Sequence, residues 1–184
     1  MKHYLFLAAL LGLFVACEKT TDPFLITTNS IGLLNDSTMI KELKTIFKND
    51  SLSKFIGGDE FTGSTNTISV YEKESGALLL ELEPNSALDS LSTIRTVRIM
   101  DPRYKNQDGI NSLSTFGELN SNYKISSIQN TLRSLIISVN DINAYFTLSK
   151  KELPEEMRYN MNSKIEAISI PESAKIKDFY LQWY

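Results

Sequence analysis

The side chains best suited to catalysis are scarce in this sequence and stand close to its beginning. Among 184 residues there is a single cysteine and a single histidine, located at Cys17 and His3. Cysteine nucleophiles, histidine-activated serines and the usual zinc sites all depend on these two residue types. The fate of the first seventeen residues therefore decides which chemistry the rest of the chain can perform.

The segment around these two residues has the pattern of a secretory signal. Lys2 and His3 are followed by an almost unbroken apolar run over residues 4–16, and polar residues begin at Glu18. The run of roughly 13 residues is shorter than the roughly 20 that a helix needs to span the hydrocarbon core of a bilayer. We therefore expect residues 1–16 to be a signal peptide that is cleaved after Ala16, whose side chain is small enough for a signal peptidase.

The last residues of this segment, Phe14-Val15-Ala16-Cys17, resemble the lipobox of bacterial lipoprotein precursors, in particular the variants of the Bacteroidota. The resemblance implies that Cys17 carries a covalent triacyl lipid and that residues 17–23 form a tether to a membrane. The mature chain would then lack histidine and free thiol, and no intrachain disulfide could form. We expect the periplasmic face of the outer membrane, because Glu18 is not the aspartate of inner-membrane retention and no acidic export run follows it.

The chemistry that remains rests on carboxylates, lysines, tyrosines and serines, and no local pattern of these residues specifies a reaction. Ser51 and Lys54 have the spacing of a serine acylase motif, but the partner motifs of those enzymes are absent. Residues 106–109 are similar to part of a calcium-binding loop that lacks its glutamate, so we expect a turn there. We predict no catalytic residue, no metal site and no cofactor other than the covalent lipid.

Size and charge favour one globular domain over residues 24–184, which is long enough to bury a full core. The net charge of the chain is −3 at pH 7, and its basic residues do not form a long cluster. Because nucleic-acid binding depends on clustered lysine and arginine, we predict no nucleic-acid partner.

The spacing of apolar residues predicts an α+β domain with a mostly antiparallel sheet and two helices. The expected strands are residues 24–28, 67–72, 77–82, 94–100, 125–128, 132–139, 142–148 and 175–184. The expected helices are residues 37–48 and a shorter one that begins at Ser114-Thr115, with a capping box between Thr115 and Glu118. Residues 49–66 are rich in serine, glycine and threonine, and we expect a long loop.

Two details of these strands bear on the core. Leu78, Leu80 and Leu82 alternate along one strand, so we expect all three to point inward. Phe179, Leu181 and Trp183 alternate along the closing strand, and we expect them to pack against the core. Removal of this strand should therefore unfold the domain.

Two stretches of the chain share a pattern that suggests an internal repeat. The first contains Gly32, Ser37-Thr38, Glu42-Leu43 and Phe47, and the second contains Gly109, Ser114-Thr115, Glu118-Leu119 and Tyr123, with one residue inserted in the first. A duplicated strand-turn-helix unit would produce this match, and so would any two capped helices. If the repeat is real, the domain should have two-fold pseudosymmetry.

Within the domain, the segment from Ile94 to Tyr123 resembles known proteins most. Its distinctive residues are Asp101, Tyr104, Gly109-Ile110 and Ser114-Thr115-Phe116. With these residues the segment resembles small Bacteroidota lipoproteins of unknown function, and it is similar to an enterobacterial lipoprotein domain under envelope-stress control. The resemblance implies a shared structural framework and assigns no functional residues.

Three Asp-Ser pairs resemble the O-glycosylation sequon of exported Bacteroidota proteins. Their hydroxyl residues are Ser37, Ser51 and Ser90. Aspartate followed by serine is also common at helix caps and turns, and Ser37 is well placed to cap a helix. If modification occurs, we expect it at Ser51 and Ser90, which fall in expected loops.

These observations favour a lipid-anchored, non-catalytic module that binds an envelope protein or a glycan. Such a module should expose several aromatic rings on a concave or edge-strand surface, and the candidates are Tyr104, Tyr123, Tyr145, Tyr180 and Trp183.

Two alternatives stay open. The first is a glycan hydrolase that uses two carboxylates about 5–10 Å apart in a cleft. Glu81 and Glu83, or Asp59 and Glu60, are adjacent acids of this kind. The second is a lipoprotein that captures a small ligand or an anion at the N–H groups of the two Ser-Thr helix starts.

Overall fold

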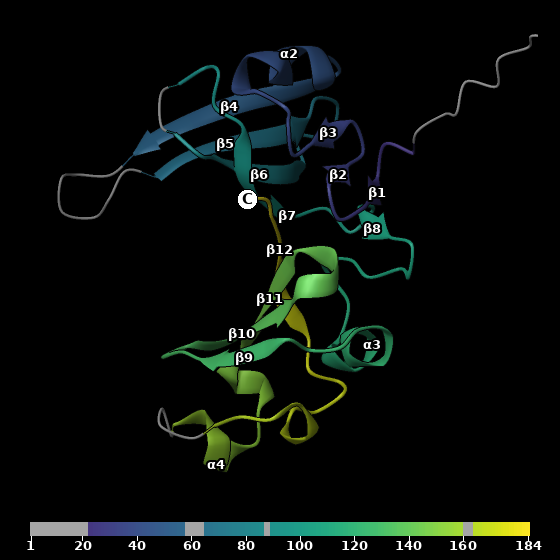
Figure 1. Ribbon diagram of the computed structural model, residues 1–184, viewed down its shortest axis with the longest axis vertical. Helices are drawn as coiled ribbons and strands as arrows, with labels where there is room; N and C mark the ends of the chain where they lie inside the picture. Colours follow the sequence, from purple (N-terminus) through teal and green to yellow (C-terminus); the bar gives the residue numbers. More distant parts are fainter. Residues whose placement is uncertain (1–21, 58–64, 87–88, 160–163) are drawn as a thin grey trace, which may run out of the picture.

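The computed structural model describes residues 22–57, 65–86, 89–159 and 164–184. These residues form an α+β domain around an eight-stranded antiparallel sheet with strand order β4-β5-β6-β7-β12-β11-β10-β9. A smaller sheet with order β3-β2-β1-β8 lies on one side of it, together with helix α3 (Figure 1). The expected signal peptide and Cys17 lie outside the described residues.

The large sheet consists of two four-stranded meanders. The first contains β4 (Asp50–Gly57), β5 (Thr65–Glu72), β6 (Leu78–Pro84) and β7 (Ile94–Ile99). The second contains β9 (Ser127–Asn130), β10 (Ser134–Val139), β11 (Ala144–Ser149) and β12 (Ile176–Gln182). The last strand of each meander, β7 or β12, pairs with the other in the middle of the sheet.

The remaining elements are short. The small sheet contains β1 (Leu25–Ile26), β2 (Ser30–Ile31), β3 (Leu34–Asn35) and β8 (Lys105–Asn106). The α-helices are α2 (Leu43–Ile46), α3 (Phe116–Asn122) and α4 (Glu155–Arg158), and the 3-10 turns are η1 (Ile40–Glu42), η2 (Asn140–Ile142), η3 (Lys150–Glu152) and η4 (Ala167–Ser169). No helix among the described residues is long and apolar enough to cross a membrane.

One face of the large sheet forms the core because alternate residues of each strand point to that side. Phe146 and Phe179 are fully buried there and stack with ring centroids 4.5 Å apart. They belong to one contiguous apolar cluster that extends to Ile31 in the small sheet and to Phe116 in α3. We call the opposite side of the large sheet the open face; its side chains at the centre are only partly buried.

Most of the expected strands are confirmed, including the closing strand, which covers Ile176–Gln182 instead of 175–184 and carries the buried Phe179 and Leu181. Trp183, directly after it, is buried as expected. The expected loop over 49–66 is wrong, because β4 occupies Asp50–Gly57 at the edge of the sheet. Among the described strands, β4 pairs with a neighbour on one edge only, and its Ser51 and Ser53 point to solvent. Its composition is therefore polar and resembles that of a loop.

Two further expectations are corrected by local geometry. The first helix is confined to residues 40–46 instead of 37–48, because Asn35 N donates to Thr38 Oγ1 at 3.0 Å and holds the preceding residues in a turn. Leu78 is only partly buried and Leu79 is buried instead. The cause is a register shift between Val70 and Tyr71 in the pairing of β5 with β6.

The remaining differences concern the length of an element. The first strand covers Leu25–Ile26 and not residues 24–28. The strands expected at 132–139 and 142–148 are joined by the 3-10 turn η2, which ends at Asn143 with a φ of 51°. Asparagine tolerates this left-handed conformation better than most residues.

The expected two-fold pseudosymmetry is present. Each half contains a capped helix followed by a four-stranded meander. The residue that caps the first helix, Met39, forms a β-bridge with Thr93, and the residue that caps α3, Thr115, forms one with Lys175. Thr93 and Lys175 each directly precede the last strand of their meander. The two halves therefore repeat the same long-range contacts as well as the same element order.

The hydrogen bonds also correct the alignment of the repeat. Asn35 N donates to Thr38 Oγ1, and Asn111 N donates to Ser114 Oγ in the same way. Thr38, and not Ser37, is thus the equivalent of Ser114, and no residue is inserted between these positions and the two capping glutamates. The sequence pattern found the repeat but placed this part of it one residue out of register.

The central position of β12 gives a stability prediction. Phe179→Ala should lower the free energy of unfolding by about 3–5 kcal/mol, because it removes a fully buried ring and leaves a cavity. The matched control is Ile168→Ala, which changes a side chain that is 93% exposed and should cost less than about 0.5 kcal/mol. Urea denaturation measures both, and a Phe179→Ala variant as stable as the control would contradict this packing.

Candidate functional site

One row of side chains crosses the open face through all eight strands. Direct cross-strand pairs join its members, which are, from β4 to β9, Ser53, Ser69, Glu81, Arg98, Tyr180, Tyr145, Ser138 and Ser127. We call these residues the central row. Residues that are directly opposite in an antiparallel pair point to the same face and contact each other.

The pseudo-two-fold axis passes between Arg98 and Tyr180, which pair with each other on β7 and β12. On the next strands, Glu81 pairs with Arg98 and Tyr145 pairs with Tyr180, so these two residues are equivalent. The strands after those carry Ser69 and Ser138 at equivalent positions. The backbone is therefore symmetric here and the side chains are not. One half contributes an ion pair, and the other contributes two tyrosines.

Arg98 binds two carboxylates from neighbouring strands. Its Nη1 lies 2.7 Å from Glu81 Oε2 on β6, and its Nη2 lies 2.5 Å from Asp178 Oδ1 on β12. The remaining nitrogen, Nε, is buried and has no hydrogen-bond partner among the described residues. The two carboxylates thus account for the hydrogen bonds that Arg98 makes within the described residues.

Asp178 is only 8% exposed, and Thr147 donates a hydrogen bond to its second oxygen. Burial by itself raises the pKa of Asp178, but the hydrogen bonds from Thr147 and Arg98 outweigh burial and hold the pKa below its usual value. The carboxylate therefore stays ionised at neutral pH and keeps Arg98 in place.

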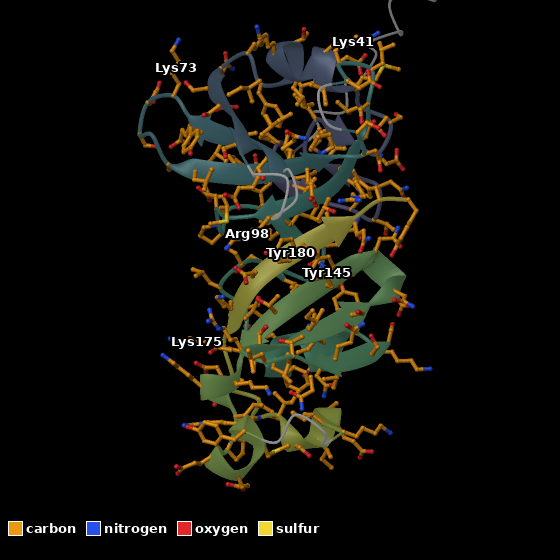
Figure 2. The ribbon with its side chains drawn as sticks, turned by 90° about the vertical axis from the view of Figure 1, so that its left-hand side faces the viewer. Lys41, Lys73, Arg98, Tyr145, Lys175 and Tyr180 are labelled. Carbon is orange, nitrogen blue, oxygen red and sulfur yellow. The ribbon has the colours of Figure 1, made fainter. Side chains whose placement is uncertain are left out.

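Tyr145 and Tyr180 form a stacked pair in the middle of the open face. Their ring centroids are 4.6 Å apart with an angle of 9° between the planes, and the guanidinium carbon of Arg98 lies 5.9 Å from the Tyr180 centroid. Figure 2 shows the three side chains following one another across β7, β12 and β11. Burial raises the pKa of Tyr145 to about 12, with a further contribution from Tyr180, so Tyr145 keeps its hydroxyl proton at neutral pH.

A hollow of about 560 Å³ lies beside Tyr145. Its lining consists of Gln129, Ile136, Ser138, Asn140, Asn143, Ala144, Tyr145, Gln182 and Tyr184. It forms because the central row changes from the large ring of Tyr145 to the small side chain of Ser138, and then to Ser127 on the edge strand. None of the lining side chains carries a charge.

The polar side chains around the hollow are unpaired. Five of them make no hydrogen bond to any described residue: Gln129, Ser138, Asn140, Asn143 and Gln182. Each amide can both donate and accept hydrogen bonds. The hollow therefore offers a set of neutral hydrogen-bonding groups next to an aromatic ring.

The central row contains two of the five aromatic residues considered from the sequence. Tyr104 and Trp183 are 4% and 3% exposed and belong to the core. Trp183 Nε1 donates to the carbonyl of Thr28 at 3.1 Å. Tyr123 is half-buried and its hydroxyl contacts Asn106 and Asp108, so it stabilises the turn expected at residues 106–109. Only Tyr145 and Tyr180 share an accessible surface.

The residues predicted for O-glycosylation are all on the surface. Ser37, Ser51 and Ser90 are exposed, although Ser51 lies in strand β4 and not in a loop. Their modification stays a prediction.

The acidic pairs named from the sequence do not meet in a cleft. Glu81 binds Arg98, and Glu83 lies 3.3 Å from Arg95 at the surface. Asp59 and Glu60 are outside the described residues. Among the described residues, no group of three or more His, Cys, Asp or Glu side chains could hold a metal ion.

A different acidic pair was not found from the sequence. Asp50 on β4 faces Glu72 on β5, and both line a smaller cleft of about 190 Å³. Burial and the nearby Glu72 raise the pKa of Asp50, whereas hydrogen bonds from Ser75 and Arg103 lower the pKa of Glu72. The sequence pattern does not indicate this pair, because it predicts a loop at Asp50 and the two residues are 22 positions apart.

The two helix starts do not leave their N–H groups free for an anion. Glu42 Oε2 accepts from Met39 N at 2.9 Å, and Glu118 Oε2 accepts from Thr115 N at 2.7 Å. The next N–H groups, of Ile40 and Phe116, donate to carbonyl groups of the strand connections. The expectation of outward-pointing N–H groups there is wrong, because the capping glutamates and the repeat contacts use them.

Comparisons with known proteins concern the fold. No protein-family model matches the chain, and a search of curated proteins found no match. The structure is similar to that of the uncharacterized protein yfeY from Escherichia coli, with a TM-score of 0.59 and 12% sequence identity. The similarity covers 86% of this chain and 99% of the E. coli chain. At this identity the comparison shows a shared fold and nothing about the ligand.

The geometry of Arg98 gives a double-mutant prediction. Arg98→Ala and Asp178→Ala should each lower the free energy of unfolding by about 1.5–3 kcal/mol, because each leaves a partly buried charge without its partner. The double variant should cost less than the sum of the two, with a coupling of about 0.5–3 kcal/mol. Arg95→Ala is the matched control, since its pair with Glu83 is exposed and worth at most about 1 kcal/mol.

The same pair sets a pH dependence. The lowered pKa of Asp178 stabilises the fold above the unfolded-state pKa of about 3.9, and this contribution is lost as the pH falls through the folded-state pKa. The stability difference between wild type and Asp178→Asn should therefore be full at neutral pH and shrink below about pH 4. Additive single variants, or a difference that does not change with pH, would contradict the ion-pair account.

Proposed function

We propose that this protein is a lipid-anchored, non-catalytic module of the bacterial envelope that binds its ligand on the open face, at the hollow beside Tyr145. The observation that carries the proposal is the group of unpaired polar side chains around the hollow. Gln129 and Asn140 are exposed and Ser138, Asn143 and Gln182 are half-buried, so water satisfies these groups in the free protein and a ligand can replace it. Groups that converge on one hollow without partners are available to a ligand.

The titration properties of the site support binding more than catalysis. A general acid or base works best with a pKa near the operating pH. The pKa of Tyr145 is raised to about 12, and the pKa of Asp178 is lowered below its usual value. Both groups are therefore fixed in one protonation state at neutral pH, which suits recognition.

The place where the tether would join the domain also agrees with the proposal. Phe24, just after the expected tether, packs edge-on against Tyr104 at 5.0 Å, and Arg103 lies over its ring at 4.8 Å. These contacts fix the start of the domain beside the small sheet, away from the open face (Figure 1). A lipid anchor at Cys17 would thus leave the hollow accessible.

A second candidate function is a carboxylate hydrolase at Asp50 and Glu72. The opposite pKa shifts of two facing carboxylates are what acid–base chemistry uses. Two observations place it below the binding proposal: Glu72 is already bound by Arg103 at 2.7 Å, and its cleft is only about 190 Å³.

The anchor has its own test. Wild-type protein expressed in its native host should sediment with the membranes and carry the mass of three acyl chains, because lipid attachment requires the thiol of Cys17. Cys17→Ser should lose the added mass and appear in the soluble envelope fraction. Ser37→Ala is the matched control and should stay with the membranes, and membrane-bound Cys17→Ser protein without lipid would contradict the anchor.

The binding surface is tested by photo-crosslinking in the native host. A photoreactive amino acid at position 138 should form a light-dependent adduct, because Ser138 lines the hollow. The same amino acid at position 168 is the control, since Ile168 is exposed on η4 and does not line it. Adducts at neither position, or equal adducts at both, would contradict binding at the hollow.

A further inference from the structure

We propose that the ligand of the hollow is a neutral glycan, with one sugar ring stacked on the free face of Tyr145. This inference rests on the proposed binding function and specifies its ligand class. It follows from three features of the hollow, which are the orientation of the Tyr145 ring, the chemistry of the lining and the position of the nearest charges.

The first feature is an uncovered aromatic face held in a fixed orientation; Tyr184 also lines the hollow, but it is fully exposed. The nearly parallel rings of Tyr145 and Tyr180 are 4.6 Å apart, which is close to the spacing of neighbouring strands. Both ring planes are therefore roughly perpendicular to the direction of the central row. Tyr180 has Tyr145 on one side and Arg98 on the other. Tyr145 has Tyr180 on one side, and its other face looks along the row toward Ser138 and the hollow.

The electron-rich face of an aromatic ring attracts the positive edges of groups that pack on it. A sugar ring has such an edge, because its C–H bonds on one side form an apolar patch. Ser138 and Ser127 are too small to cover Tyr145, so a flat, weakly polar group can lie on the ring. This contact would orient one sugar of a chain.

The second feature is a neutral, amide-rich lining. Gln129, Asn140, Asn143 and Gln182 line the hollow, and their side-chain amides make no hydrogen bond among the described residues, although backbone groups of Asn140, Asn143 and Gln182 do. Each amide has two N–H donors and an acceptor oxygen. A sugar hydroxyl also donates and accepts, so it matches an amide side chain in both roles. Ile136, Ala144 and the rings of Tyr145 and Tyr184 supply an apolar part about as large as the polar part, which matches a sugar with both C–H faces and hydroxyl groups.

The third feature is the saturation of nearby charge. An acidic ligand such as a phosphate or a uronate needs arginine or lysine in its site. Among the described residues no cation lines the hollow, and Arg98 lies behind Tyr180 with both Nη groups bound to Glu81 and Asp178. Arg95, whose charge also acts on Tyr145, is paired with Glu83 at 3.3 Å. In the part of the chain that the structure describes, no carboxylate side chain lines the hollow. The site therefore favours an uncharged partner.

The size of the hollow fits part of an oligosaccharide. Its volume of about 560 Å³ lies within the roughly 300–1,000 Å³ of known small-molecule sites. The hollow opens at the surface next to the edge strand β9, so a longer chain can extend beyond it.

The test uses glycans released from the envelope of the native host and separated by anion exchange into a neutral and an acidic pool. Saturation-transfer NMR with the purified protein should detect binding of the neutral pool and not of the acidic pool. Tyr145→Ala should weaken binding about tenfold, the upper range for one aromatic stacking contact. Tyr159→Ala is the matched control, since Tyr159 is exposed and does not line the hollow.

A second variant keeps the test valid if Tyr145→Ala does not fold. Ser138→Tyr should fill the hollow from the open face without changing the core, and it should abolish binding of the neutral pool while unfolding at the same temperature as wild type. Binding of the acidic pool, or unchanged binding of the neutral pool by both variants, would overturn the inference.

The outcomes also separate this inference from the proposed function. If the crosslinker at position 138 captures a protein while neither pool binds, the glycan inference fails and the binding function stands. If there is no crosslink and no pool binds, both fail. Binding of the neutral pool that depends on Tyr145 and Ser138 supports both.

Discussion

The pairing of β7 with β12 is the contact on which the rest of the structure depends. Each strand ends one meander, and their pairing joins the two halves into one sheet. Arg98 strengthens this seam, because it stands on β7 and binds Glu81 on β6 and Asp178 on β12. Core residues of both strands, among them Phe179 and Ile99, continue the contact on the other face. Without this seam there would be two small sheets, each with an exposed edge.

The symmetry of the backbone also explains why the open face has a hollow on the Tyr145 side of the seam. Equivalent positions carry Glu81 and Arg98 in one half and Tyr145 and Tyr180 in the other. The ion pair neutralises the centre of the face and covers Tyr180, so Tyr145 is left with one free side. The serines beyond Tyr145 then leave space at the surface. Divergence of a few side chains on a repeated framework is enough to create the candidate site.

Much of the fold follows from local sequence signals. The capping box of Thr115 and Glu118 and the turn at residues 106–109 depend on neighbouring residues, and both are confirmed. The edge strand β4 was assigned to a loop because its composition is polar and half of its pairing surface is unused. The repeat was visible, although hydrogen bonds were needed to align Thr38 with Ser114.

The site was less accessible to sequence reasoning. Tyr145 and Tyr180 were named as candidates together with rings that lie in the core, since aromatic residues have no local mark of exposure. Their stacking, and the contact of Arg98 with Asp178, depend on the register of strands that are far apart in the chain. Glu81 and Asp178 bind Arg98 from the two neighbouring strands, a pairing that the order of residues in the sequence does not reveal.

The central claim is that the free face of Tyr145 is the contact surface of the protein. NMR of tyrosine rings labelled with carbon-13, recorded while the neutral envelope glycans are added, tests it most directly. The account predicts the largest shift for the ring of Tyr145, a smaller one for Tyr180 and none for the buried Tyr104. An unchanged Tyr145 ring in the presence of bound glycan would contradict it.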